Sequence, residues 1–312
     1  MRKILSLAIV LLAFGSLSAQ SKIYWGNTIT NDIRRSNLDG SNVEVLVTGV
    51  FFPEGIDVDT DGGKMYYMNG TSSLFRANLD GSNVETIVTG LSSPDGVAID
   101  FCAQKVYWAE STPRTIKRAN LDGSNIETIL TTVNGPEGIA VDGVSGKVYW
   151  VNLGGSEIRS ANLDGTNEQL IVSFPATVGP LSLAKEMNSG KIYWTELNGG
   201  RVLRADPDGN NVEVLITKGT LGGISVDAKN GKIYYADWDD DSIYRANLDG
   251  TGDMLLTSAS GNVIDLALDL PNPCNVAAPR AAIPTMSQWG LLIFGLFVLN
   301  IGVVLLQREE LT

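Results

Sequence analysis

The chain of 312 residues contains no histidine. This absence excludes Ser-His-Asp triads, zinc sites built on imidazole, and histidine acting as a general base. Cysteine is almost as scarce: Cys102 and Cys274 are the two in the sequence, and they form no Cys-x-x-Cys motif. This pattern disfavours a metal centre or a redox-active dithiol. No pairing of a nucleophile with a base is visible, so we assign no catalytic residue.

Basic residues are also few. Residues 20–270 hold 19 Lys and Arg against 33 Asp and Glu, a net charge of −14. Nucleic acids and anionic membrane surfaces need a basic footprint, so both are disfavoured as partners. The balance favours cations, basic peptides or neutral glycans, and solubility alone is the simpler interpretation.

What the chain does have is one segment repeated six times. Each copy opens Lys-apolar-Tyr-Trp or Lys-apolar-Tyr-Tyr and ends near Asn-Leu-Asp-Gly. The copies start 42, 41, 42, 44 and 41 residues apart, at Lys22, Lys64, Lys105, Lys147, Lys191 and Lys232. A period near forty with four short apolar runs is typical of a β-propeller with one blade per repeat. The predicted fold is all-β: a six-bladed β-propeller of four-stranded antiparallel blades.

One repeat shows the expected strands of a blade. Residues 138–142 are a continuous apolar run, as expected for an innermost strand, and residues 147–151, 158–162 and 169–172 follow as the other three strands. The first repeat lacks an innermost strand before Lys22. Residues 266–269 resemble residues 139–142, so the C-terminal strand is predicted to complete the N-terminal blade.

The ends of the chain do not follow the repeat. Residues 1–19 have the basic start, apolar run and small-residue end of a secretory signal peptide, with cleavage expected after Ala19. Residues 20–270 are the predicted propeller, and residues 271–284 form a Pro- and Ala-rich linker. The apolar run 289–306 is long enough for a transmembrane helix. The protein is therefore expected to be exported and held at the cell envelope or surface.

The two cysteines fall near the ends of predicted innermost strands. Cys102 follows Asp100, and Cys274 follows Asp269. Both residues should emerge on the same face of the propeller, so a Cys102–Cys274 disulfide is one possibility in an oxidising compartment. Two free thiols are the other.

The repeats resemble the YWTD propeller of low-density-lipoprotein receptors, whose repeat is known as class B. The resemblance rests on Tyr-Trp-x-Asp/Asn/Glu, Pro-Glu-Gly-Ile-Ala-Val-Asp and Ala-Asn-Leu-Asp-Gly, and it covers residues 21–270. In that family the Asp of the first motif helps to tie blades together, a role that Asn can also fill. Here the position is occupied by Asn27, Asn69, Glu110, Asn152, Glu196 and Asp237.

Residues 283–312 resemble a bacterial IPTLxxWG sorting domain. The motif residues are Ile283, Pro284, Thr285, Trp289 and Gly290, with Met286 in place of Leu. The resemblance implies that an exosortase-type membrane enzyme recognises the motif and removes the helix. The chain would then be held in the membrane before processing, and it would be at the cell surface or secreted afterwards. The basic cluster that ends such domains is reduced here to Arg308, and a plain membrane anchor is the alternative.

The candidate binding site lies where the repeats differ. The residue that opens each innermost strand is aligned as Glu54, Asp95, Glu137, Gly179, Gly222 and Ile264. We call Glu54, Asp95 and Glu137 the acidic crescent. It is a candidate site for a basic group or a cation such as Ca²⁺, and carboxylates that only cap turns are the alternative. Four further groups of candidate ligand-binding side chains lie nearby, namely Phe51 with Phe52, Trp238, Arg114 and Arg201, and packing of the loops is the alternative for the aromatic ones.

Two other patterns are interpreted as structural. Residues 57–62 match the start of a calcium loop, but Met68 occupies the twelfth position, where Glu is required. A recurring arginine is expected to pair across strands with an acidic residue, as Arg35 with Glu44 and Arg245 with Asp253.

Three functions remain open at this point. The leading hypothesis is a non-enzymatic recognition domain that binds an extracellular protein or glycan through the face that carries the varied loops. The second is a metal-dependent propeller hydrolase or lactonase, with the acidic crescent and Asn152 as metal ligands. The third is a purely structural surface protein.

Overall fold

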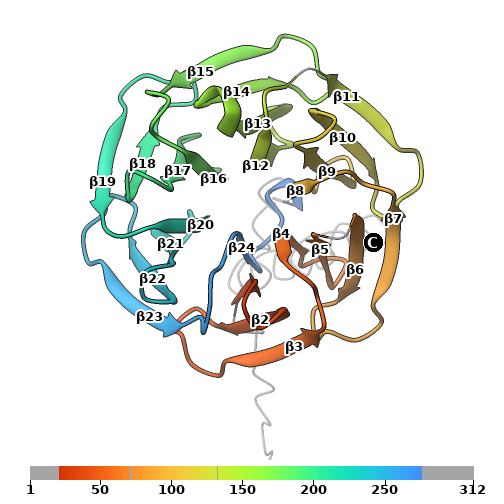
Figure 1. The fold of residues 1–312 in the computed structure, drawn as a ribbon, viewed down its shortest axis with the longest axis horizontal. Coiled ribbons are helices and arrows are strands. Elements are labelled where there is room, and N and C mark those ends of the chain that lie inside the picture. The colour runs from red at the N-terminus through yellow and green to blue at the C-terminus, as the bar shows by residue number, and fades with distance from the viewer. Residues whose placement is uncertain (1–20, 71, 132, 276–312) are drawn as a thin grey trace, which may run out of the picture. The chain divides into compact units, whose positions relative to one another are not determined.

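The structure, a computed structural model, describes residues 21–70, 72–131 and 133–275. Within these ranges the chain forms six four-stranded antiparallel sheets, which are arranged as blades around a common centre (Figure 1). The predicted six-bladed β-propeller is confirmed. The signal peptide, the sorting motif and the apolar run 289–306 lie outside the described residues. Among those that are described, no helix is long and apolar enough to cross a membrane.

Each blade runs from an innermost strand at the centre to an outer strand at the rim. For blades 1 to 6 the innermost strands are β24 (Leu266–Leu268), β4 (Pro53–Asp59), β8 (Pro94–Asp100), β12 (Pro136–Asp142), β16 (Pro180–Lys185) and β20 (Leu221–Asp227). The second strands are β1 (Lys22–Asn27), β5 (Lys64–Asn69), β9 (Lys105–Glu110), β13 (Lys147–Asn152), β17 (Ile192–Glu196) and β21 (Lys232–Asp237).

The third and fourth strands complete each blade. The third strands are β2 (Asp32–Asn37), β6 (Ser73–Asn78), β10 (Thr115–Asn120), β14 (Glu157–Asn162), β18 (Arg201–Ala205) and β22 (Ser242–Asn247). The outer strands are β3 (Glu44–Thr48), β7 (Glu85–Thr89), β11 (Glu127–Thr131), β15 (Gln169–Ser173), β19 (Glu213–Thr217) and β23 (Met254–Ser258). Two short 3₁₀ turns, η1 (Leu153–Gly155) and η2 (Pro273–Asn275), lie between and after the strands.

The ring closes as predicted from the first repeat, which lacks an innermost strand of its own. β24 pairs antiparallel with β1, with Ile23 opposite Leu268 and Trp25 opposite Leu266. Blade 1 is therefore assembled from both ends of the described chain. Without β24, one edge of β1 would be left without a hydrogen-bonding partner.

The hydrophobic core is divided among the interfaces between blades. Trp108 of blade 3 is fully buried and packs in one cluster with Tyr66 and Met68 of blade 2. Both faces of a second strand are covered because each blade lies between two others, which explains why the Lys-apolar-Tyr-Trp segment is aromatic and apolar throughout. Burial of one such side chain contributes about 1.5–3 kcal/mol.

A recurring arginine also links each of five blades to the next. Its guanidinium donates to the carbonyl of the leucine in the next blade's Asn-Leu-Asp-Gly hairpin. The five bonds are Arg35 to Leu79 (2.8 Å), Arg76 to Leu121 (3.1 Å), Arg118 to Leu163 (2.9 Å), Arg204 to Leu248 (2.8 Å) and Arg245 to Leu38 (3.1 Å). In blade 4 this position is Ser160, aligned with Arg118 by the strand register, and the link is missing.

The predicted cross-strand pairs are present in four of these five blades, as between Arg35 and Glu44 at 2.7 Å. The predicted pair of Arg245 with Asp253 is wrong. The register places Arg245 opposite Met254, one residue further along, and Asp253 accepts instead from the hydroxyl of Tyr235 at 2.6 Å.

We expect Arg118→Met to destabilise the domain more than Arg159→Met. Arg118 bonds across the blade interface, whereas Arg159 pairs within its own blade with Glu157 and Glu168. Loss of the interblade bond should lower the free energy of unfolding by about 1–2 kcal/mol, and loss of a surface ion pair by about 0.5 kcal/mol. Thermal melts of the two variants measure the difference. Equal melting temperatures would show that the interblade bond adds no stability.

The face opposite the varied loops carries the short turns between the first and second strands. In blades 2, 3, 4 and 6 this turn is capped by the aspartate that ends the innermost strand, and in blade 5 it is capped by Glu186. Asp59 accepts from the backbone of Gly62 at 3.0 Å, and Asp142 accepts from Ser145 at 2.9 Å. The calcium-like start at residues 57–62 is thus one of these capped turns, as its place in the repeat indicates.

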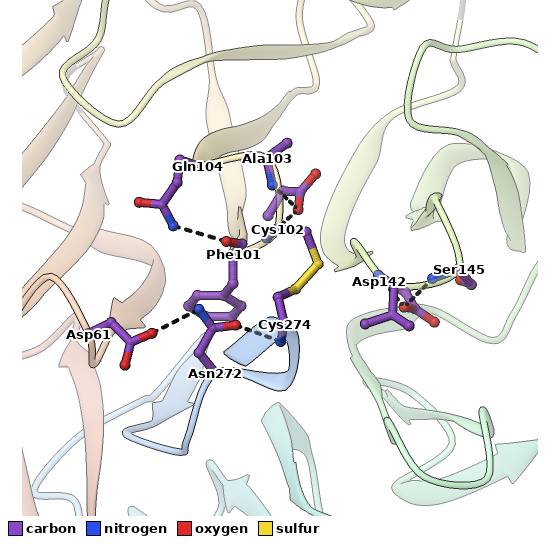
Figure 2. Close-up of a disulfide and its surroundings, with 11 residues drawn as sticks. Asp61, Phe101, Cys102, Ala103, Gln104, Asp142, Ser145, Asn272 and Cys274 are labelled. Carbon is purple, nitrogen blue, oxygen red and sulfur yellow. Dashed lines mark hydrogen bonds between the residues drawn. A yellow bond between two sulfur atoms is a disulfide. The ribbon is translucent and has the colours of Figure 1, made fainter. Parts of the chain in front are cut away.

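The segment after β24 crosses this same face. Leu270 accepts from the Thr60 hydroxyl at 3.0 Å, and Asn272 donates to Asp61 at 2.8 Å, both in the turn of blade 2. Cys274 is then joined to Cys102 in the turn of blade 3 by a disulfide, with 5.3 Å between the Cα atoms (Figure 2). The closing strand is therefore fixed to two further blades beyond its own.

Candidate functional site

The loop-rich face is the face at which the innermost strands begin and the second strands end. The strand register defines equivalent positions there: Pro53 lies opposite Asn69, Pro136 opposite Asn152 and Pro180 opposite Glu196. The residues that follow the opening proline, or the residue equivalent to it, are therefore Glu54, Asp95, Glu137, Leu181, Gly222 and Ile264. Gly179 was the wrong choice for blade 5. The link from β15 to β16 is two residues longer than the link from β11 to β12, which shifts the alignment.

A small cavity opens at the centre of this face. It is lined by the acidic crescent of blades 2 to 4, by Leu181 and Ser182 of blade 5, and by Ile264 and Asp265 of blade 1. Its volume for the centre of a water-sized sphere is about 20 Å³. One water needs roughly 10–15 Å³ on this measure, so the cavity admits one group of that size.

The crescent carboxyls share protons. Burial, and secondly the charge of Asp95, raise the pKa of Glu54 and of Glu137 to about 8. Burial also raises the pKa of Asp95, but only to about 6, because interactions with Ser111 and with the two neighbouring glutamic acids favour its charged form. Near neutral pH the crescent as a whole therefore retains protons, and its three carboxyls are not all ionised.

Two half-buried aspartates near the crescent, Asp57 and Asp265, were not predicted from the sequence. Asp57 accepts from the backbone of Ile99 at 2.8 Å, and Asp265 accepts from Ile56 at 3.2 Å, so each links two innermost strands. Burial raises the pKa of both to about 7. A break in the repeat marked them: Asp57 stands where the other five blades have Ala or Ser, and Asp265 where they have Gly or Ser.

The raised pKa values of Glu54, Glu137, Asp57 and Asp265 predict an unusual dependence of stability on pH. Because their pKa values are raised on folding, the folded state binds more protons than the unfolded state between about pH 4 and pH 8. Their contribution is present in acid and is lost as the pH rises towards 8. We expect the melting temperature to fall by several degrees from pH 5 to pH 8.5. Glu54→Gln with Glu137→Gln should flatten the profile, and an unchanged slope would contradict the assignment.

The crescent does not form a ready metal site. Among the residues described, no three Asp, Glu, Cys or His side chains converge to hold an ion. The fourth ligand of the hydrolase hypothesis is also misplaced. Asn152 is buried within its own blade, where it accepts a hydrogen bond from the Trp150 indole at 2.9 Å and donates one to Glu157 at 3.0 Å.

Phe51 and Phe52 are exposed on the loop-rich face, at 59% and 43% of their surface. Their backbone is nevertheless held on both sides. The Phe52 amide donates to Asn31 at 3.1 Å, and the carbonyls of both residues accept from Gly70. Ile29, also exposed, lies in the loop that contains Asn31. The two rings are thus presented to solvent by a fixed backbone.

Phe52 adopts a left-handed backbone conformation, with φ of 52°. The equivalent residue before the opening proline is Ser93 in blade 3 and Gly135 in blade 4, at φ of 45° and 66°. This conformation disfavours a bulky side chain by about 1–2 kcal/mol and suits glycine. A phenylalanine is therefore kept where the local backbone favours a smaller residue.

The other predicted ligand-binding side chains have internal contacts, except Arg114. The Trp238 indole donates to the carbonyl of Val263 at 2.8 Å and covers Gly222, where any Cβ would collide with it. These contacts show that Trp238 packs against the neighbouring loop, which was one of the two roles predicted for it. Arg201 pairs with the fully buried Glu196 at 2.6 Å. Arg114 is exposed, and the described chain offers its side chain no hydrogen bond or ion pair.

The fourth residue of the Tyr-Trp motif varies among the blades. Both Asn and Glu at this position bond to the segment that links two blades. Asn27 donates to the carbonyl of Ala259 at 2.7 Å, which joins blade 1 to the link from blade 6. Glu110 accepts from Ser92 in the link from blade 2, and from the Trp108 indole at 3.0 Å. Glu110 is therefore a structural residue.

Comparison with known proteins agrees with this architecture. Residues 104–142 match the low-density lipoprotein receptor repeat class B. They cover the last three strands of blade 3 and the innermost strand of blade 4. A search of curated proteins finds no match.

Two solved structures are similar in fold. A chain in the crystal structure of a nidogen/laminin complex has a TM-score of 0.73 and 21% sequence identity, over 80% of this chain and 98% of that chain. A gluconolactonase from Xanthomonas campestris has a TM-score of 0.59 and 15% identity, over 69% of this chain and 78% of that chain. At such identities the likeness extends to the fold alone.

Proposed function

We propose that this protein is an exported, non-enzymatic recognition domain that binds a partner protein through its loop-rich face. The exposed pair Phe51 and Phe52 carries the proposal. Rigid aromatic side chains beside charged groups are typical of the centres of protein interfaces. The left-handed backbone of Phe52 adds weight, because residues kept against local stability cluster at functional sites.

The fold neighbours are consistent with this choice. The neighbour of higher TM-score comes from a complex between two proteins, which supports a protein partner more than a glycan. The gluconolactonase neighbour does not carry a hydrolase proposal, because Asn152 is engaged away from the cavity. The class B repeat and the Cys102–Cys274 disulfide both fit an extracellular location.

Capture of the partner tests the proposal. The full chain, expressed in its own organism, is cross-linked and recovered as wild type, as Phe51→Ser/Phe52→Gly, and as the control Val45→Ser/Val214→Ser. Val45 and Val214 are also half-exposed but lie on the outer strands of blades 1 and 5. We expect one protein to be recovered with the wild type and the control and to be lost with the first variant. Equal recovery with all three, or no recovery, would favour a purely structural role.

The sorting domain adds a separate prediction. If an exosortase-type enzyme processes the motif at residues 283–290, the mature surface protein should lack the apolar run from Leu291 onward. Intact-mass measurement of protein from the native surface decides this. A mass that retains Arg308 to Thr312 would leave the plain membrane anchor as the correct interpretation.

A further inference from the structure

The exposed aromatic pair and the acidic cavity are parts of one surface. Phe52 is separated from Glu54 by Pro53 alone, and at Pro53 the chain turns from the surface into β4. Pro53 is buried, whereas Phe51 and Phe52 are exposed. A partner that rests on the two rings therefore has the opening of the cavity beside it.

Within the described part of the chain, no cation is paired with the crescent. Every charged neighbour that shifts the pKa of Glu54 or Glu137 is another carboxyl. Three basic side chains at this face are occupied elsewhere, namely Arg34 with Asp32, Lys117 with Glu110 and Arg201 with Glu196. Arg114 is exposed and is not among the residues that line the cavity.

The size and the lining of the cavity select the kind of cation. Space of about 20 Å³ for the centre of a water-sized sphere favours a compact ammonium group, which is as small as water, over the wider planar guanidinium. Blades 2 to 4 contribute the carboxyls, while Leu181 of blade 5 and Ile264 of blade 1 contribute apolar surface. A lysine matches both, because its aliphatic stem packs on apolar groups while its ammonium meets acidic ones.

We propose that the partner inserts a lysine side chain into this cavity, with its ammonium on Glu54, Asp95 and Glu137, and rests an adjacent apolar side chain on Phe51 and Phe52. This inference rests on the proposed function and specifies the partner's chemistry. Charge complementarity between a carboxyl-lined opening and a cationic segment gives the specificity, and the rings contribute apolar contact area.

Proton release is an independent signature of this binding mode. Near neutral pH the crescent retains protons, because burial and mutual repulsion raise the pKa of Glu54 and Glu137, and an arriving ammonium favours their loss. Asp57 and Asp265 are the other titratable groups beside the cavity, and their pKa values lie in the same range. Affinity for a lysine-bearing segment should therefore increase between pH 5.5 and pH 8, whereas contact with the rings alone would not change.

The probe is a phage-displayed library of random heptapeptides, selected on the purified full-length protein. We expect enrichment of peptides that carry a lysine next to an aromatic or aliphatic residue. In the enriched peptide, replacement of lysine by arginine or by norleucine should weaken binding at least tenfold, measured by fluorescence anisotropy. The protein variant Glu54→Gln/Asp95→Asn/Glu137→Gln should weaken it at least tenfold as well.

Matched variants separate the two parts of the surface. Phe52→Gly should weaken binding by a similar factor without unfolding the domain, since Gly135 fills the same position in blade 4. Val45→Ser/Val214→Ser should leave it unchanged, and thermal melts confirm that each variant is folded.

The outcomes divide clearly. Enriched peptides without lysine whose binding still depends on Phe51 and Phe52 overturn the lysine inference and leave the proposed function standing. Peptides whose binding is lost in Val45→Ser/Val214→Ser, but not in Phe52→Gly, overturn both. No enrichment at all, or binding that does not strengthen with pH, also overturns the inference.

Discussion

Truncation after Asn262 is expected to abolish cooperative folding of the propeller. The cut removes β24, whose side chains Leu266 and Leu268 are buried against β1 and blade 6, while Ala267 is buried against β1 and blade 2. It also uncovers Trp25 and leaves the inner edge of β1 unpaired. Each large apolar side chain lost from a core lowers stability by about 1.5–3 kcal/mol, and whole domains are stable by only about 5–15 kcal/mol.

Truncation after Asn275 is the matched control. It retains β24, the bonds to Thr60 and Asp61, and the disulfide, so it should melt cooperatively as a monomer. Circular dichroism melts and size-exclusion chromatography of both products give the comparison. If the shorter product keeps the melting temperature of the longer one, ring closure by β24 is not what stabilises blade 1.

Removal of the disulfide should have the second-largest effect. The bond joins residues 172 positions apart, so it excludes many conformations of the unfolded chain. In Cys102→Ser/Cys274→Ser we expect the free energy of unfolding to fall by about 2–5 kcal/mol, or roughly 10 °C in melting temperature.

Asn272→Ala provides the control for this prediction. It breaks the bond to Asp61 in the same crossing segment but leaves the disulfide intact, and it should lower the melting temperature much less. A double cysteine variant with the melting temperature of the wild type, or of Asn272→Ala, would contradict this prediction. It would show that the crossing segment itself, and not the covalent bond, stabilises the closure of the ring.

The repeat was sufficient to predict the fold because each copy carries the same turns and the same succession of short apolar strands. It could not align blade 5, where the link before β16 is longer and the opening carboxylate is absent. The interblade bonds of the recurring arginines were also out of reach. A sequence shows that Arg118 faces Glu127, but the carbonyl of Leu163 approaches only when two blades are packed.

The site was predicted in part for a similar reason. Glu54, Asp95 and Glu137 were found because they vary at an aligned position, and the structure brings them together around one cavity. Asp57 and Asp265 break the pattern of small residues at two neighbouring positions and were open to the same reasoning. Trp238 could be placed only through its contact with Gly222, since a sequence does not show which side chain covers a glycine.

Hydrogen–deuterium exchange of the full chain, with and without the peptide selected on it, tests recognition by the loop-rich face most directly. Bound peptide should slow exchange in segments 26–32 and 49–56, which hold Ile29, Phe51, Phe52 and Glu54, and in the segments around Asp95 and Glu137. The outer strands at residues 127–131 and 213–217 should be unaffected. Protection that falls on those outer strands, with none on the loop-rich face, would contradict the account.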